Sequence, residues 1–305
     1  MVETPGGLFY LSSSFSIALF PAILIFSTLG LVFTFRIRLF TRNRNHLISY
    51  LRETLNKNYP KLWEKEYNDW FKTTEKLAYE KTRRRQLIVY SLIFLISINL
   101  FFVLKLFVDV NKEKSDSLPA GLIYLPFLLL SLILLSTLGP ILSGRHADAI
   151  GIIPDKIIYS IFYIFPKIKK SLFYFVHEPI PTYYGDPRII ESLVYLKNRK
   201  RIRKLKIFYN ILGRISDEQK IWIEEEVLKR YEEKGLSELL SPLNRRIDHQ
   251  HFMLGDNSVV RIEKKHPPWV DLPPEQHMFP NDTYLLNPIL AMELKSFLRK
   301  YGLKT

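Results

Sequence analysis

The chain has 305 residues, with 44 Lys and Arg against 30 Asp and Glu, so its formal net charge is +14. It has no cysteine, which excludes disulfides, thiolate metal sites and cysteine nucleophiles. The sequence also lacks phosphate-binding loops, dinucleotide fingerprints, Gly-x-Ser-x-Gly and His-Glu-x-x-His, so we expect no cofactor and favour a protein that is not an enzyme.

Three long uncharged apolar runs are the main feature of the chain. Each of Phe15–Phe35, Leu87–Leu104 and Leu118–Ser143 is long enough to cross a bilayer, which takes roughly 20 apolar residues. Basic residues follow the first run and precede the second, which places the loop between them on the cytoplasmic side. We therefore predict an integral, multi-pass membrane protein with its N-terminus outside and its C-terminal domain cytosolic. The predicted fold class is mainly α: three transmembrane helices and a mostly helical cytosolic domain containing a small β-hairpin.

Composition divides the chain into five predicted segments. They are the N-terminal segment and first transmembrane helix (1–35), a cytosolic helical loop (36–86), a transmembrane hairpin (87–143), a juxtamembrane interfacial segment (144–180) and a basic cytosolic helical domain (181–305).

The loop before the second apolar run is predicted to hold two helices. His46–Asn56 has apolar residues at helical spacing, and Pro60 separates it from a second amphipathic helix. Trp63 and Trp70 lie broadly on one face of that second helix. This aromatic stripe is predicted either to bind a partner or to pack within the protein.

Residues 155–176 are aromatic and amphipathic, and we predict an interfacial helix pair there. A Pro- and Tyr-containing connector, 177–187, precedes a very basic stretch, 188–214, which is helical in pattern. The basic residues are candidates for contact with anionic lipid headgroups or other anions. Nucleic acid and a merely solvated face are the alternatives, and nucleic acid is the less favoured partner because no base-reading module accompanies the patch. The candidate residues are Lys167, Lys169, Lys170, Arg199, Lys200, Arg201, Arg203 and Lys204.

Two later helices have clear end signals. Ser216 and Gln219 form a capping box at the start of the first helix, and Gly235 ends it. The second helix is capped by Asn287 and closed by Gly302.

Between these helices, the sequence predicts a β-hairpin around Gly-Asp-Asn at 255–257. His249 and His251 are two residues apart and would share one face of a strand, which makes them weak metal-ligand candidates. The Pro-rich stretch 266–274 carries Trp269, either as a partner-binding residue or as a buried anchor.

The function predicted from these features is that of a structural or interaction protein, a non-catalytic component of a larger membrane assembly. Its expected partners are the lipid bilayer and a protein partner or a second copy of the chain. The alternatives are a channel or transporter subunit acting as an oligomer, and a membrane-bound metal-dependent enzyme using the histidine region.

Overall fold

The computed structural model describes most of the chain after residue 148 and one stretch before it. The described residues are 38–80, 149–151, 153–199, 202–210, 216–245, 247, 249–264 and 280–303. Nearly all of them belong to one unit, formed by Phe40–Ala78 and Leu142–Thr305. The other unit, Met1–Leu39 and Tyr79–Ile141, lies almost wholly outside the described residues.

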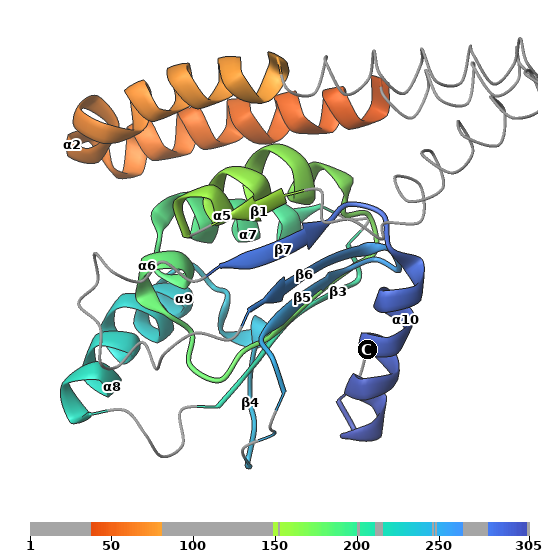
Figure 1. Cartoon of the computed structure of the whole chain (residues 1–305). Coiled ribbons are helices and arrows are strands. Elements are labelled where there is room, and N and C mark those ends of the chain that lie inside the picture. The colour runs from red at the N-terminus through yellow and green to blue at the C-terminus, as the bar shows by residue number, and fades with distance from the viewer. Residues whose placement is uncertain are drawn as a thin grey trace, which may run out of the picture. The chain divides into compact units, whose positions relative to one another are not determined.

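Seven strands of the described residues form one mixed sheet with the order β1-β7-β6-β5-β2-β3-β4 (Figure 1). They are β1 (Ala149–Gly151), β2 (Ser171–Phe175), β3 (Lys204–Tyr209), β4 (Leu240–Pro242), β5 (Phe252–Gly255), β6 (Val259–Glu263) and β7 (Asn281–Tyr284). Strands β2, β3 and β4 run parallel, and the remaining neighbours pair antiparallel.

Helical crossovers join the parallel strands, as parallel pairing requires. Helix α7 (Pro187–Asn198) connects β2 to β3 after the short α6 (Pro181–Tyr184). The second crossover connects β3 to β4. It consists of α8 (Asp217–Ile223), η4 (Glu224–Lys229), α9 (Arg230–Glu233) and η5 (Ser237–Leu239).

The sheet has an apolar layer on each face. Alternate residues of β2 point to opposite faces, so Leu172 and Tyr174 join one hydrophobic cluster while Phe173 and Phe175 join the other. Helix α10 (Pro288–Lys300) covers the second cluster (Figure 1). Helices α5 (Ile153–Tyr159) and α7 lie on the first face, where η2 (Ser160–Ile164) and η3 (Phe165–Lys167) continue α5.

A helical hairpin packs on this first layer. Residues 38–58 and 68–80 are helical, and α2 (Pro60–Leu62) and η1 (Trp63–Tyr67) join them after a break at Tyr59. The hydroxyl of Tyr163 donates a hydrogen bond to the carbonyl of Ala78 at 3.0 Å, and the hairpin's apolar residues join the same cluster as α5 and α7. The predicted helices on either side of Pro60 are confirmed.

The mainly α fold class is wrong, because the described domain is a mixed α/β fold. The two stretches predicted as helical, 155–176 and 188–214, each contain a helix followed by a strand of the sheet, β2 and β3. Both strands are inner strands of the sheet. Strand β2 is apolar after Ser171, as expected for a strand covered on both faces, and in β3 three apolar residues follow Lys206 without alternation. Such runs cannot be told from a buried helix by periodicity alone.

The membrane assignment is corrected as well. No helix within the described residues is both long and apolar enough to cross a membrane. The three predicted spans, 15–35, 87–104 and 118–143, lie outside those residues. The integral, multi-pass assignment with its N-out, C-cytosolic topology is therefore not retained. The functions predicted with it, a membrane-assembly component, a channel or transporter subunit or a membrane-bound enzyme, are not retained either.

Local end signals are confirmed. The Ser216 hydroxyl accepts from the backbone of Gln219 at 3.3 Å, and the Gln219 side chain accepts from the backbone of Ser216 at 3.0 Å. The Asn287 side chain caps α10 by accepting from Leu290 N at 3.1 Å. The hairpin is formed by β5 and β6, although it is only one part of the larger sheet.

Candidate metal centre

The candidate site lies where β5 begins. Strand β5 pairs antiparallel with both β6 and β2, so its first residue lies beside the ends of those two strands. His251 directly precedes β5, and its carbonyl accepts a hydrogen bond from the backbone N–H of Glu263 at 2.9 Å. His251 and Glu263 are therefore cross-strand neighbours whose side chains meet.

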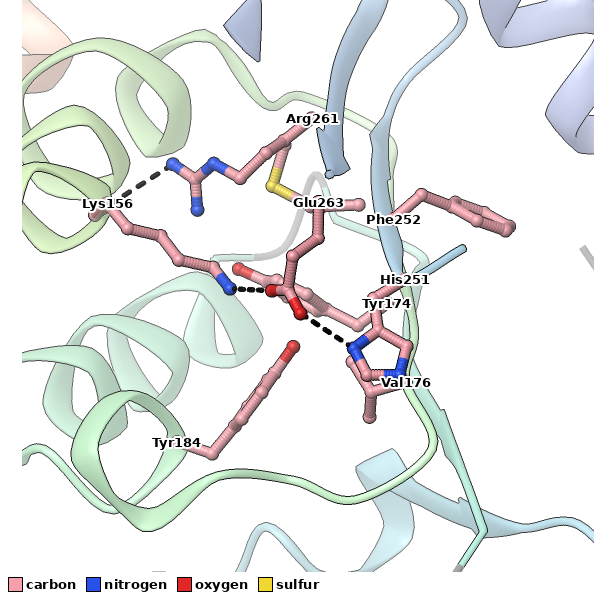
Figure 2. A pocket seen from close by; sticks show the side chains of 9 residues that line it. Lys156, Tyr174, Val176, Tyr184, His251, Phe252, Arg261 and Glu263 are labelled. Atoms are coloured by element: carbon pink, nitrogen blue, oxygen red, sulfur yellow. Dashed lines mark hydrogen bonds and ion pairs between the residues drawn. The ribbon is translucent and has the colours of Figure 1, made fainter. Parts of the chain in front are cut away.

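Glu263 joins His251 to a buried lysine (Figure 2). Its Oε1 lies 2.9 Å from Nδ1 of His251, and its Oε2 lies 2.9 Å from Nζ of Lys156. Only 5% of Glu263 and 6% of Lys156 is exposed. Because Lys156 belongs to α5, this ion pair ties that helix to the sheet inside the domain, where loss of one partner is costly.

Arg261 strengthens the same connection. It lies two residues before Glu263 and so shares its face of β6. Its guanidinium, on a residue only 2% exposed, donates to the carbonyl of Lys156 and to the hydroxyl of Ser160, each at 3.1 Å. Lys156 is consequently held at its main chain by Arg261 and at its ammonium group by Glu263.

His177 and Glu178 approach His251 from the end of β2. The backbone N–H of His177 donates to Nε2 of His251 at 3.1 Å, and the two imidazole rings meet edge to face with centroids 4.7 Å apart. One ligand atom from each of His177, Glu178 and His251 lies within 4.8 Å of the others, and all three residues are half-buried. Among the described residues, these three form the group of histidines and carboxylates whose spacing suits a metal ion.

The hydrogen-bond network assigns a tautomer to each histidine. Nε2 of His251 accepts the His177 amide, so Nδ1 carries the proton and donates to Glu263. Nε2 of His177 lies 2.9 Å from the carbonyl oxygen of Ile247, which can only accept, so Nδ1 carries the lone pair. Each ring therefore has one nitrogen able to bind a cation and one N–H held by an oxygen, the arrangement usual for histidine ligands of metals.

A small cavity lies beside these groups (Figure 2). Its volume is about 10 Å³, room for about one water molecule. Burial raises the pKa of Tyr174 and of Tyr184 well above the ordinary tyrosine value, so both phenols stay protonated. A cavity of this size admits a water molecule but no organic substrate. It is lined by Lys156, Tyr174, Val176, Tyr184, His251, Phe252, Met253, Arg261 and Glu263.

Of the two histidines predicted as metal ligands, the structure brings only His251 into this group. Nδ1 of His249 lies 2.8 Å from the carbonyl oxygen of Gln250, and the His249 ring lies 4.0 Å from the ring of Phe297 on α10. Sequence reasoning missed His177 and Glu178, since the segment before them was predicted as a helix. The partner of His251 in fact lies 74 positions away along the chain.

The predicted partner-binding tryptophans of the helical hairpin pack within the domain. The Trp70 ring centroid lies 5.9 Å from that of Phe162 and 4.8 Å from that of Phe71, and Trp63 lies 6.0 Å from Phe71. The guanidinium of Arg188 lies 4.5 Å from the Trp70 ring centroid. The third predicted residue, Trp269, is outside the described residues.

No family model matches the chain, and no curated protein matches it either. Among solved structures, a phospholipase D family member, Nuc from Salmonella typhimurium, is similar over 50% of this chain and 91% of its own, at 16% identity and a TM-score of 0.33. TrmBL2, an archaeal chromatin protein, is similar over 57% of this chain and 59% of its own, at 11% identity and a TM-score of 0.32. Likenesses this distant do not carry an activity from one protein to another.

Proposed function

We propose that this domain binds a divalent transition-metal ion through His177, Glu178 and His251. The observation that carries the proposal is the convergence of two oriented imidazoles and one carboxylate within 4.8 Å. Two nitrogen ligands and one oxygen ligand suit zinc, which is commonly bound by histidine together with aspartate or glutamate.

The required movement is small. Zinc bonds of about 2.0–2.2 Å in tetrahedral geometry place neighbouring ligand atoms roughly 3.4 Å apart. The ligand atoms now lie within 4.8 Å of one another, so each separation must shorten by no more than about 1.4 Å on binding the ion. In the metal-bound form, Nε2 of His251 exchanges the His177 amide for the ion, while Glu263 continues to hold Nδ1 and so fixes the ring.

Three protein ligands leave a fourth tetrahedral position for water, as in zinc sites that perform chemistry. None of the three residues is fully buried, which suits a site that water can reach. The site that we propose is accordingly an open one. Its metal-free form is held by hydrogen bonds that the ion partly replaces.

Zinc titration of the metal-free full-length protein by calorimetry tests the proposal. We expect one equivalent to bind, and we expect His251→Ala to lose that binding. His249→Ala is the matched control, because it removes a histidine two positions away that lies outside the group. Circular dichroism of both variants checks that they fold.

Thermal unfolding supplies a second measurement. A ligand that binds only the folded state at 100 times its dissociation constant adds about 2.7 kcal/mol of stability. We expect this zinc-dependent stabilisation in the wild type and in His249→Ala, and we expect it to vanish in Glu178→Ala and His251→Ala. The proposal is wrong if the wild type binds no zinc, or if His249→Ala loses as much affinity as His251→Ala.

A further inference from the structure

The fold brings together two basic segments that are far apart in the sequence. Strands β2 and β3 begin side by side, with Ser171 paired to Lys204. The carbonyl of Lys170 accepts hydrogen bonds from the backbone of Arg203 at 2.9 Å and of Lys204 at 3.2 Å. All three of these basic residues are exposed, as is Lys169. We call the six described basic residues of these segments the basic surface: Lys167, Lys169, Lys170, Arg199, Arg203 and Lys204. Lys200 and Arg201, which were predicted with them, lie outside the described residues.

The helical hairpin holds the two segments in place through one buried amide. The Asn43 side chain donates to the carbonyl of Pro166 at 3.2 Å and accepts from the guanidinium of Arg199 at 3.1 Å. Both basic segments are thereby fixed to residues 38–58. The basic surface is thus a product of tertiary structure and not of one charged helix.

The positive charge at the centre of this surface is not balanced locally. Within the part of the chain that the structure describes, Lys169, Lys170 and Arg203 form no ion pair. The nearby carboxylate of Asp256 accepts from the backbone N–H groups of Lys169, Lys170 and Ser171 at 2.8–3.1 Å. Asp256 therefore binds main-chain amides, and its carboxylate forms no ion pair with either lysine among the residues that the structure describes.

We propose that the basic surface binds the headgroups of anionic phospholipids at a membrane surface. Lysine and arginine near an anionic bilayer each contribute about a five-fold gain in affinity. Such attraction needs clustered charge on exposed flexible side chains and no shaped pocket, which is what these segments provide.

Charge clusters also attract nucleic acids, and arginine can read guanine, but tight binding of single strands also needs open aromatic rings on which bases stack. Among the described residues, the rings of Phe40 and Tyr195 contact this surface, and both residues are half-buried. Lys167 and Arg44 lie 5.8 and 5.4 Å from the Phe40 ring centroid, and Arg199 lies 5.7 Å from the Tyr195 ring centroid. Each of these rings therefore already has a cation against it. Attraction to anionic lipid headgroups requires only the clustered positive charge.

The test compares the affinity of the full-length protein for phosphatidylcholine vesicles with and without phosphatidylserine. The ratio of the two affinities isolates the part that depends on headgroup charge. Lys169→Ala with Lys170→Ala should lower this ratio roughly thirty-fold, because two charges are lost. The backbone amides that bind Asp256 remain in this variant, so the fold is retained.

Lys57→Ala with Lys61→Ala is the matched control. It removes the same charge from two exposed lysines at the turn of the helical hairpin, at the opposite end of residues 38–58 from Asn43. We expect the control to keep the wild-type ratio and added salt to weaken the wild type's preference. An equal loss in both double variants overturns the proposal, as does a wild-type ratio near one. The proposal is also overturned if the protein binds duplex DNA more tightly than the anionic vesicles and if Lys169→Ala/Lys170→Ala lowers only the affinity for DNA.

Discussion

Replacing Lys156 by Met tests how far the interior ion pair stabilises the domain. The methionine side chain is one atom shorter than that of lysine but keeps most of its volume and has no ammonium group, so the change leaves little empty space. It leaves the Glu263 carboxylate, 5% exposed, without the cation that lies 2.9 Å from its Oε2. His251 still donates to the other carboxylate oxygen, Oε1.

The expected loss of stability is large. Removing one partner of a buried pair typically costs about 3–5 kcal/mol, because the remaining charge is buried without compensation. The free energy of unfolding of a typical domain is about 5–15 kcal/mol, so Lys156→Met removes a substantial fraction of the total stability. Glu263→Gln alone should also destabilise the domain, since the ammonium group then lacks its carboxylate.

Urea unfolding followed by tryptophan fluorescence measures these changes, and a double-mutant cycle separates the pair from its surroundings. In Lys156→Met/Glu263→Gln neither charge is left unpaired, so the double variant should be more stable than the sum of the two single losses predicts. Contacting residues couple by about 0.5–3 kcal/mol. A Lys156→Met variant within about 0.5 kcal/mol of the wild type, the range of ordinary surface changes, would refute the reasoning, and so would a coupling energy of zero.

Two further predictions concern Asp256 and the buried tyrosines. Asp256→Ala should cost about 1–3 kcal/mol in urea unfolding, because three backbone amides lose their acceptor. Asp256→Asn should cost less, since asparagine keeps an acceptor oxygen and tolerates the positive φ of 51° at this position; equal losses would contradict this account. For the buried tyrosines, burial raises the folded-state pKa of Tyr174 and Tyr184 above the unfolded value of about 10. The unfolded chain therefore releases these protons first, and stability falls as pH rises above about 10. Circular dichroism should lose its folded signal as the last phenolate absorbance appears, and phenolate absorbance that is complete before unfolding would contradict this prediction.

Chemistry that acts over a few residues was predictable from the sequence. The capping box at Ser216, the asparagine cap at Asn287 and the hairpin turn after Gly255 each depend on neighbouring residues alone. Gly235 and Gly302 take positive φ values of 64° and 73° at helix ends, a conformation that glycine adopts without strain. Such signals fix where elements end, but they do not say which strands pair.

The inner strands were not predictable in the same way. Leu172, Phe173, Tyr174 and Phe175 are all buried, because β2 has helices on one face and α10 on the other. The two-residue alternation that marks a half-exposed strand is therefore missing, and the flanking lysines strengthened the helical interpretation. The same misassignment concealed His177 and Glu178, which become interesting only once β2 is known to pair with β5.

One strand register connects these features of the site. Pairing Phe175 with Phe252 brings His177 beside His251, and pairing Phe252 with Ile262 brings Glu263 beside His251 from the other side. The same register turns Arg261 and Glu263 toward α5. A shift of one residue in β5 would move its side chains to the opposite face and separate the ligands from their hydrogen-bond partners. The contacts that order the sheet are thus also the contacts that orient the proposed ligands, and the hydrogen bond from His251 to Glu263 would serve both the sheet and the proposed metal site.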